Sequence, residues 1–550
     1  MEKLRFIAIS GTTSVTQNLY IYEYGNDMIV VDCGIGFPED VATFGIDLEI
    51  PDFSYIVKNK NKLRAIFVTH AHEDHFGALP FLFQEVSAPI YATRLTAAFI
   101  EDKFIDYNVR KPTLNVFDPE KDTIKVGSFE VSPFRVTHSV PDAAGLCIKT
   151  PVGKVFHVPD YKFDWTPVSQ KTFDISRAAQ LTSGGVLALA SDSLGATSDG
   201  YTKSELDLER NIEVLVEEAK GRVFFTTLSS NISRMQQAIN VSTTLGRKVV
   251  FVGRSTERKA EIAKKLGYLN YSEGTVISGG KVPHLPPNKI TYIISGSYGQ
   301  ADSALSKVAR GEHKSLKIDK GDVVIFSADP APPGTEQAVN KLVDILIESG
   351  ADVHYYDTQE DLHVSGHGSQ KEIEMLLALI EPRFLIPIGG TVRHMLAFRE
   401  LAQKMGWKED EVFELRAGGS VEFSPNAGEK GPTVPVRSVL VDGLGVGDVG
   451  AVVLGDRKIL AKEGVVVVVL RVGKSKDLVG SPELISRGFV FAKTQQGFLH
   501  RGAEALSLEI RKKGARDEKS IKETTTSFLE HFFFEETGRR PMILPVVVEV

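Results

Sequence analysis

The sequence contains few cysteines, no long apolar run and no excess of positive charge. Its only two cysteines, Cys33 and Cys147, exclude a disulfide framework and favour a reducing cytoplasm. The longest apolar run, GVVVVVL (464–470), is far shorter than the ~18–20 residues of a membrane span, and MEKLRFIAIS at the start lacks the apolar core of a secretory signal. With 71 acidic and 64 basic residues, the 550-residue chain has a net charge of −7. This balance excludes a generally nucleic-acid-binding surface but permits a local basic groove.

Hydrophobic patterning divides the chain into three regions. Up to residue 204, apolar strands such as MIVVDCG and AIFVTH alternate with short loops. From residue 205, amphipathic stretches alternate with short strands such as RVFFTT and KVVFVG, a pattern typical of a parallel sheet covered by helices. Histidine- and glycine-rich loops return after residue 356. We therefore expect one domain made of residues 1–204 and 357–435, with a second domain, residues 205–356, inserted into it.

The remaining part of the chain predicts a separate small domain. Residues 436–454 form a predicted linker, and residues 455–550 a predicted α+β domain. In the helical stretch SIKETTTSFLEHFFFEETG, Ser520 and Glu523 have the spacing of a capping box.

A cluster of metal-binding residue types lies in VTHAHEDHFGAL (68–79). His70, His72, Asp74 and His75 directly follow the apolar run AIFV, and alternation in an extended segment puts the first two on one side. His138 and Asp160 each follow another apolar strand, where residues of functional sites often lie. The alternative is a polar loop that is rich in histidine by chance, with His138 as a structural histidine.

These residues resemble, in order and spacing, the metal ligands of the metallo-β-lactamase superfamily. Asp192 in ASDSLGA and His367 in HVSGHGS are similar to motifs of the β-CASP nucleases within it. GIDLEIPDFSYI, THSVPDAAGL and TGRRPMILPVVVEV resemble bacterial ribonuclease J along essentially the whole chain. The resemblance implies an α/β fold: an αββα metallo-β-lactamase sandwich with an inserted β-CASP domain and a small C-terminal α+β domain.

The resemblance also implies a metal centre and its chemistry. His70, His72, His138 and Asp160 would hold one ion, and Asp74, His75 and the shared Asp160 a second. One or two Zn²⁺ ions suit these ligands, and Mn²⁺ is an alternative. Such ions activate water and offset charge on a phosphodiester. The implied catalytic residues are Asp74, His367 and Asp192, with His367, held by Asp192, as proton donor.

Family members bind the 5′-monophosphate of single-stranded RNA, and four residues match that binding site: Ser230, Asn231, His363 and Ser365. The alternative for Ser230 and Asn231 is helix capping ahead of RMQQAIN, and for His363 an exposed loop histidine. We expect Arg234 and Arg254 to line an electropositive RNA channel, the alternative being a solvated surface.

The sequence departs from the family pattern at several positions. The family's last metal ligand is a histidine in P-V-H-G-E, but IPIGGTVRHM has Gly389 there and Thr391 in place of the glutamate. Pro159 stands in HVPD where H-T-G-D is usual, and Ser233 where a histidine is common. We therefore expect a weakened second metal site.

Three functions remain open on the sequence. The first is a metal-dependent RNA phosphodiester hydrolase, a 5′-to-3′ exonuclease and/or endonuclease in the maturation and decay of RNA, including rRNA. The second is a catalytically impaired subunit that binds RNA or a partner nuclease. The third, a glyoxalase-type thioesterase, explains neither the insertion nor HVSGHGS. Family members pair through the C-terminal region, which predicts a homodimer or homotetramer, with a hetero-oligomer as the alternative.

Overall fold

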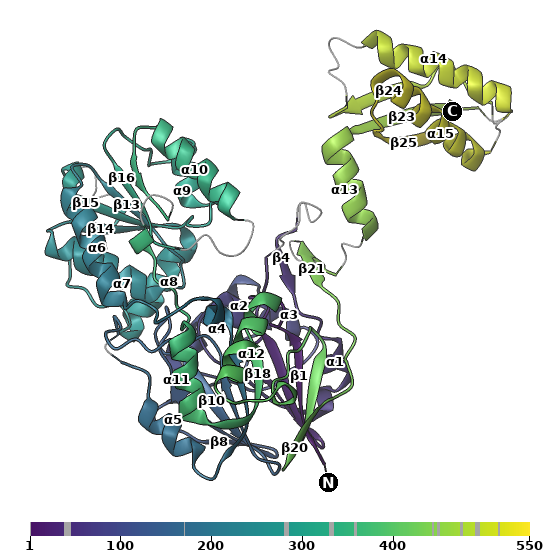
Figure 1. Ribbon diagram of the computed structural model, residues 1–550. Helices are drawn as coiled ribbons and strands as arrows, with labels where there is room; N and C mark the ends of the chain where they lie inside the picture. The colour runs from purple at the N-terminus through teal and green to yellow at the C-terminus, as the bar shows by residue number, and fades with distance from the viewer. Residues whose placement is uncertain are drawn as a thin grey trace. The chain divides into compact units, whose positions relative to one another are not determined.

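The computed structural model describes residues 2–37, 46–169, 171–279, 285–328, 335–356, 360–442, 445–447, 451–473, 477–489, 496–514 and 517–550. The chain forms two compact units. The first comprises Met1–Phe37 and Leu48–Val439, and the second comprises Pro38–Asp47 and Leu440–Val550 (Figure 1). Within the described residues, no helix is long and apolar enough to cross a lipid bilayer.

Two β-sheets form the centre of the first unit. The eight-stranded sheet contains, in spatial order, β20 (Ala427–Lys430), β19 (Gly419–Ser424), β1 (Leu4–Ser10), β2 (Leu19–Tyr24), β3 (Asp27–Val31), β5 (Leu63–Val68), β6 (Ile90–Ala92) and β7 (Leu114–Val116). The six-stranded sheet contains β18 (Pro382–Ile388), β12 (Val186–Asp192), β11 (Lys154–Val158), β10 (Ala144–Lys149), β9 (Phe129–Arg135) and β8 (Ile124–Val126). A further short strand, β4, spans Leu48–Ile50.

The two sheets pack face to face around an apolar core. Alternate residues of each strand point inward, so that Phe6 and Tyr22 of one sheet pack against the same core as Leu146 and Ile386 of the other. Helices cover the outer faces (Figure 1). They are α1 (Ser54–Lys58), α2 (Glu73–Phe76), α3 (Leu79–Leu82) and α4 (Arg94–Asp106) beside the first sheet, and α5 (Ile175–Thr182), α11 (Gln370–Ile380) and α12 (Val392–Lys404) beside the second. The predicted αββα sandwich is confirmed.

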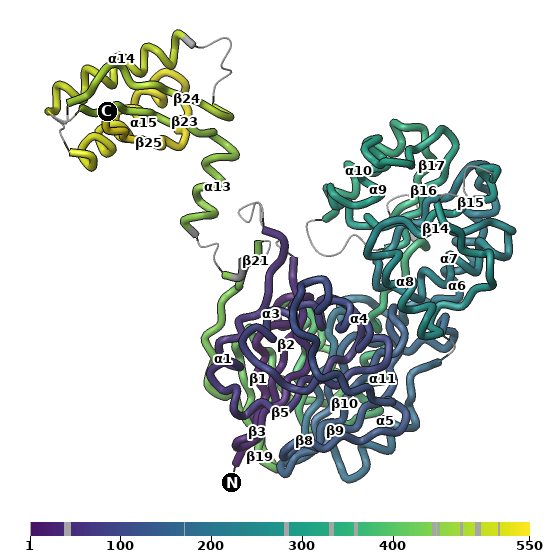
Figure 2. Tube along the Cα trace, turned by 180° about the vertical axis from the view of Figure 1, so that it is seen from behind, coloured from purple at the N-terminus to yellow at the C-terminus, as the bar shows by residue number. Residues whose placement is uncertain are grey.

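A second α/β domain is inserted between two neighbouring strands of the sandwich. β12 and β18 pair in parallel, with Asp192 opposite Ile388, and the chain between them forms a five-stranded parallel sheet. Its strands, in spatial order, are β14 (Lys248–Val252), β15 (Ile290–Ile294), β13 (Val223–Thr226), β16 (Val323–Phe326) and β17 (Asp352–His354). Its helices are α6 (Glu205–Glu218), α7 (Ile232–Thr244), α8 (Arg254–Leu266), α9 (Ala304–Ala309) and α10 (Glu336–Glu348) (Figure 2).

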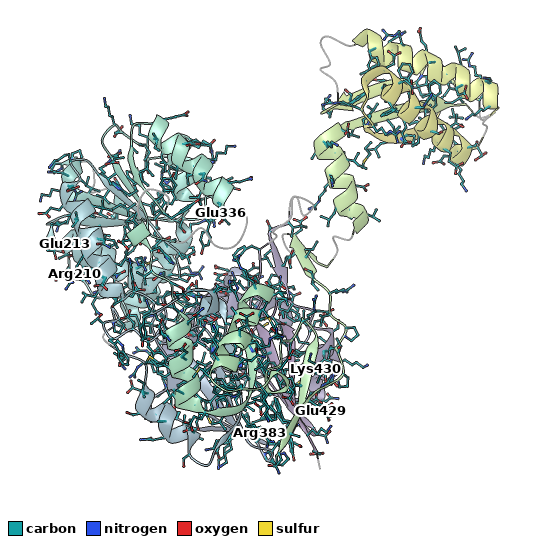
Figure 3. All side chains as sticks on the ribbon, in the orientation of Figure 1. Arg210, Glu213, Glu336, Arg383, Glu429 and Lys430 are labelled. Atoms are coloured by element: carbon teal, nitrogen blue, oxygen red, sulfur yellow. The ribbon has the colours of Figure 1, made fainter. Side chains whose placement is uncertain are left out.

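The helices of the inserted domain are amphipathic. In α6, Leu208, Ile212 and Leu215 recur at helical spacing and are buried. Arg210 on the same helix and Glu336 on α10 are exposed and point to solvent (Figure 3). The limits predicted for this domain, residues 205 and 356, remain predictions.

The second unit contains its own small core. Its elements are β21 (Val439–Asp442), β22 (Gly445–Val446), α13 (Ala451–Glu463), β23 (Val465–Val472), β24 (Glu483–Arg487), α14 (Gln496–Lys513), α15 (Glu518–Thr537) and β25 (Met542–Glu549). Leu506 of α14 and Leu529 of α15 pack with Val466 and Val468 on one face of the β24–β23–β25 sheet. On the strands of this sheet, four large apolar side chains are exposed: Ile485, Leu544, Val546 and Val548.

The capping box predicted at Ser520 is wrong. Helix α15 begins one turn earlier, and Asp517 is its N-cap, whose carboxylate accepts a hydrogen bond from the Ser520 N–H at 2.9 Å. Aspartate and serine both favour the N-cap position, so the pattern alone did not distinguish them.

Candidate metal centre

The segment that carries the histidine cluster turns sharply after a buried strand. β5 ends at Val68, the chain bends at His70 and Ala71, His72 is extended, and the short helix α2 begins at Glu73. The bend and the helical turn that follows it bring His70 and His72 to one group of donors and Asp74 and His75 to the next.

The first group of donor atoms comes from three segments of the first domain. His70, His72, His138 and Asp160 each offer one donor atom, and these atoms all lie within 4.8 Å of one another. His138 Nε2 is 3.1 Å from His72 Nδ1, and His70 Nε2 is 3.5 Å from Asp160 Oδ2. Bonds of about 2.0–2.2 Å to one cation place its ligand atoms at such separations.

The second group shares Asp160 with the first. His75 Nε2 lies 3.5 Å from Asp74 Oδ2 and 3.4 Å from Asp160 Oδ2. The same Asp160 oxygen is 3.5 Å from His138 Nε2. Asp160 therefore stands between two adjoining sets of donors, as a residue that bridges two cations would.

Hydrogen bonds to the outer nitrogens fix the orientation of two of these imidazoles. His138 Nδ1 donates to the carbonyl oxygen of Gly366 at 2.8 Å, and His75 Nδ1 donates to Asp32 Oδ2, also at 2.8 Å. Because these oxygens can only accept, Nδ1 of each ring carries a proton, and Nε2 is the atom left to face the cluster of donors. Asp32 itself is wholly buried and accepts from the Thr69 N–H at 2.8 Å. The sequence analysis did not identify Asp32, although it ends the apolar run MIVV of a predicted strand.

Burial and neighbouring charges set the protonation of the cluster. Burial lowers the pKa of His70 and of His138 well below the usual value, assisted by neighbouring imidazoles, and lowers that of His72 to about 4. Burial also opposes protonation of His75, but Asp160, Asp74 and Asp32 outweigh it and raise its pKa. The three imidazoles of the first group are thus neutral and ready to bind a cation, whereas a cation at the second group would displace a proton from His75.

The donor set fits a divalent cation. His70 Nε2 is buried and has no hydrogen-bond partner, which is costly unless another group satisfies it. It points into a group of imidazole nitrogens and a carboxylate, the ligands that zinc prefers. Within the described residues, three groups of such side chains are close enough to hold a metal, and the third is Asp160, Asp192 and His367.

His367 and Asp192 form a pair beside the metal-binding groups. His367 Nδ1 lies 2.7 Å from Asp192 Oδ2, and its Nε2 lies 3.8 Å from Asp160 Oδ2. Burial lowers the pKa of His367, but Asp192 and Asp160 outweigh it and raise the pKa to about 9. The imidazole is thus protonated at neutral pH.

Gly389 lies against this pair and offers no donor side chain. Its φ is +66°, and a Cβ built on it would be 3.3 Å from Asp192 Oδ1. His394, which follows in the same stretch, makes a local contact instead: its Nδ1 accepts from the Thr391 N–H at the start of α12.

Two of the four residues matched to a phosphate site make other contacts in the structure, Asn231 and Ser365. Asn231 caps α7 and accepts from the Arg234 N–H at 2.9 Å, and Ser365 Oγ accepts from the His367 N–H at 3.1 Å. Ser230 is buried. His363 is half-buried and its Nδ1 has no partner, so it is not an exposed loop histidine.

The expectation that Arg234 lines an RNA channel is wrong. Its side chain is fully buried, with one guanidinium nitrogen 3.0 Å from Glu205 Oε2 and another 2.7 Å from Ser327 Oγ. Lys162 Nζ lies 3.0 Å from the other Glu205 oxygen. A buried carboxylate needs such counter-charges, and this one takes Arg234 as its partner. Arg254, by contrast, is exposed.

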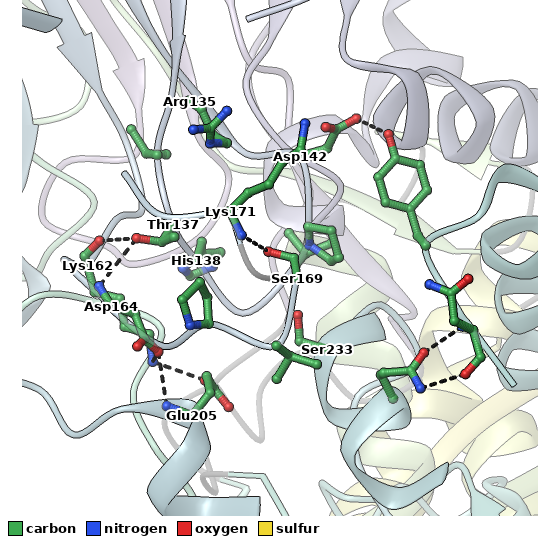
Figure 4. A pocket seen from close by; sticks show the side chains of 18 of the residues that line it. Arg135, Thr137, His138, Asp142, Lys162, Asp164, Ser169, Lys171, Glu205 and Ser233 are labelled. Atoms are coloured by element: carbon green, nitrogen blue, oxygen red, sulfur yellow. Dashed lines mark hydrogen bonds and ion pairs between the residues drawn. The ribbon is translucent and has the colours of Figure 1, made fainter. Parts of the chain in front are cut away.

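Two cavities adjoin the metal centre. One, of about 390 Å³, is lined by His138, Lys162 and Glu205 and reaches Ser233 on the inserted domain (Figure 4). The other, of about 660 Å³, lies between α4 and α8 and is lined by Glu73, Lys103, Arg254 and Lys307 among others. Both lie where the two domains of the first unit meet.

This architecture and donor set define a metallo-β-lactamase-type hydrolase with an inserted β-CASP domain. Four family models match the chain: "Beta-lactamase superfamily domain" at residues 28–236, "Ribonuclease J, beta-CASP domain" at 220–346, "Zn-dependent metallo-hydrolase RNA specificity domain" at 357–410 and "Ribonuclease J C-terminal domain" at 452–550. The chain belongs to the ribonuclease J family, a family of RNA hydrolases.

Full-length relatives agree with this assignment. Ribonuclease J2 of Bacillus subtilis (strain 168) is 36% identical, over 100% of this chain and 99% of its own. Ribonuclease J 1 of Streptococcus pyogenes is 35% identical, over 98% of this chain and 97% of its own. A crystal structure of a protein of unknown function from Enterococcus faecalis V583 matches 76% of this chain and 100% of its own with a TM-score of 0.54. At 15% identity it supports the fold alone.

Proposed function

We propose that this protein is a metal-dependent phosphodiesterase that cleaves single-stranded RNA from the 5′ end, internally, or both, in RNA maturation and decay. The observation that carries the proposal is the convergence of six donor side chains, from His70 to Asp160, beside His367 and Asp192. The buried, unpaired cysteines Cys33 and Cys147 suit a reducing cytoplasm.

Cations would be held by two adjoining sets of residues. His70, His72, His138 and Asp160 make the first set, and Asp74, His75 and Asp160 the second. When bound, such cations lower the pKa of water and offset negative charge on the phosphodiester. Zn²⁺ suits the imidazole-rich first set, whereas the carboxylate-rich second set also accepts Mn²⁺.

The protein's own residues move and hold the proton. His367 carries a proton on Nε2 at neutral pH, on the side that faces Asp160, while Nδ1 is held by Asp192. His367 would therefore donate to the leaving oxygen, and Asp192 would hold the ring in place. Asp74 would act from the opposite side as a ligand of the second set.

RNA would lie where the two domains meet. We place the 5′-monophosphate near Ser230, Asn231, His363 and Ser365, because the unpaired Nδ1 of His363 needs a partner. Arg254, Lys307 and His313 line the larger cavity and would neutralise backbone phosphates.

A second candidate function follows from Gly389. With no side chain there, Asp74, His75 and Asp160 alone would hold the second cation. A weakly occupied site would make the protein an impaired subunit that binds RNA or a partner nuclease. Metal content per chain, measured together with turnover of 5′-monophosphorylated RNA, separates the candidates. The enzyme turns over RNA and speeds up as Zn²⁺ or Mn²⁺ fills the weak site. The subunit binds RNA without turnover at any metal concentration.

The protein would work as a homodimer or homotetramer. Four exposed apolar side chains share one face of the β24–β23–β25 sheet, namely Ile485, Leu544, Val546 and Val548, and exposed apolar patches mark protein contacts. A second copy of this chain would cover it, and a related nuclease subunit is the alternative partner.

A further inference from the structure

The metal-binding segment contains a glutamate that is not among the proposed ligands. Glu73 begins α2 and stands between His72 and Asp74 in the chain. Its carboxylate is one-quarter exposed and contacts two lysines, one from each domain of the first unit. Lys103 of α4 belongs to the sandwich domain and pairs with Oε2. Lys259 of α8 belongs to the inserted domain, and its Nζ lies 3.0 Å from Oε1.

Lys259 is held in this position by its surroundings. Its side chain is nine-tenths buried, and its Nζ lies 5.6 Å from the centre of the Phe99 ring on α4. A buried ammonium needs a counter-charge, and Glu73 is the carboxylate with which it pairs. The ion pair therefore ties one helix of the inserted domain to the segment that bears four of the six donors.

A second link joins the same two helices without touching the metal-binding segment. Arg258, the neighbour of Lys259 on α8, pairs with Asp102 and Asp106 of α4. This link is more exposed, with the Arg258 side chain 39% accessible. The two adjacent cations of α8 thus make different contacts: Arg258 pairs with α4 alone, whereas Lys259 also reaches the α2 carboxylate Glu73.

We propose that Lys259 is a positioning residue that couples the docking of the inserted domain to the metal centre, through Glu73. The Asp74 and His75 donors follow Glu73 in the same helical turn, so a shift of Glu73 moves them relative to Asp160. Partners outside the ligand set typically affect metal affinity roughly 10–100-fold. The effect on metal binding is independent of the substrate, and only the consequence for RNA cleavage rests on the proposed function.

The test compares Lys259→Met with Arg258→Met in the full-length protein. Each variant removes one cation from α8, and methionine keeps most of the aliphatic stem. Zn²⁺ affinity is measured on chelator-stripped protein by competition with a fluorescent chelator, and hydrogen exchange is followed over residues 70–76. We expect Lys259→Met to weaken Zn²⁺ binding about tenfold and to speed exchange in this segment. Arg258→Met should change Zn²⁺ affinity less than about twofold. Lys259→Arg keeps a cation at this position and should bind Zn²⁺ with the affinity of the wild type.

Three results would decide against the coupling. These are equal Zn²⁺ affinities for Lys259→Met and Arg258→Met, unchanged affinity in Lys259→Met, or failure of Lys259→Arg to restore it. If Lys259→Met does not fold, Glu73→Gln replaces it, and wild-type Zn²⁺ affinity in that variant overturns the proposal equally. RNA cleavage is assayed in parallel. Loss of Zn²⁺ affinity in Lys259→Met with no cleavage by the wild type upholds the coupling and overturns the proposed function. RNA cleavage by the wild type, with unchanged Zn²⁺ affinity in Lys259→Met, upholds the proposed function and overturns the coupling.

Discussion

His75 Nδ1 lies 2.8 Å from a carboxylate oxygen of Asp32, and both side chains are buried. Asp32 has a left-handed backbone, with φ +61°, which is uncommon for a residue with a side chain. Strained backbone conformations occur most often at functional sites, where the surrounding structure holds them in place. Here the strained residue accepts the hydrogen bond that orients His75, a proposed metal ligand.

Asp32→Asn should weaken metal binding at the group of Asp74, His75 and Asp160. Asparagine has a single acceptor oxygen, so it cannot serve both the Thr69 N–H and the His75 ring as the two carboxylate oxygens do. We expect a loss of roughly 10–100-fold in affinity for the second cation. Titration of chelator-stripped protein with Zn²⁺ or Mn²⁺ measures it. Unchanged stoichiometry and affinity would remove Asp32 from the metal centre.

Gly389→His should raise metal occupancy towards two ions and speed RNA cleavage. The φ of +66° makes any side chain here cost about 1–2 kcal/mol of stability. Gly389→Ala is the matched control, because it bears the same backbone cost without an imidazole. Zinc per chain and thermal unfolding are measured on both. A histidine variant that binds no more zinc than the alanine variant would show that this position does not reach the cation.

His367→Ala should lower kcat for 5′-monophosphorylated RNA by about 10²–10⁴-fold, because it removes the proposed proton donor. Zinc content should stay close to that of the wild type, since the two proposed ligand sets do not include this residue. His531→Ala, which changes an exposed histidine of α15, serves as control. A fall in zinc content equal to the fall in rate would make His367 a ligand instead.

Glu205→Gln should destabilise the protein by about 3 kcal/mol, because it leaves buried Arg234 and Lys162 without their shared counter-charge. Burial alone would raise the pKa of Glu205, but these two cations lower it from 4.5 to about 2. A depressed carboxyl pKa stabilises the fold fully above pH 4.5, and this contribution is lost as the pH falls from 4.5 to 2.

The difference in unfolding free energy between wild type and Glu205→Gln should therefore be constant near neutral pH and shrink below pH 4.5. Denaturant unfolding at a series of pH values measures it. Glu217→Gln, on the exposed face of the same helix, should stay within about 0.5 kcal/mol of the wild type. A difference that does not depend on pH would mean that Glu205 is not ionised in the folded protein.

Val546→Glu should shift the protein to monomers, because it places a charge on the exposed apolar face of the second unit. Leu508→Glu is the control, since Leu508 is 70% exposed on α14, a helix that covers the other face of this sheet. Light scattering after size-exclusion chromatography gives the molar mass. A wild-type monomer, or a Val546→Glu variant of unchanged mass, would contradict pairing through this face.

Local patterns in the sequence predicted most of the fold and the donors of the site. Alternation along the chain predicted strands and an inserted domain, and the αββα sandwich followed from the resemblance to a known family. Four of the six donors lie within six consecutive positions, where only a turn is needed to gather them. The sequence did not identify Asp32, because no motif around this aspartate at the end of a strand distinguishes it from other aspartates. Its contact with His75 forms only when β3 and β5 pair.

The prediction that Arg234 lines an RNA channel was wrong for a related reason. A basic residue in a polar stretch near a predicted phosphate site suggests a solvated or phosphate-binding side chain. Its partner Glu205 lies on another helix, 29 residues earlier, and only the packing of α6 against α7 brings them together. Burial of a charge depends on such distant partners, so it could not be predicted from the sequence pattern.

The pairing of β12 with β18 separates the inserted domain from the residues of the candidate metal centre along the chain. The inserted domain begins and ends at adjacent strands of one sheet, and all six donors lie on segments that precede β12. The second domain is thus inserted at a single point of the sandwich, without dividing the six proposed ligands. Changes within the inserted domain can therefore reshape the surface beside the candidate metal centre while leaving all six donors in place.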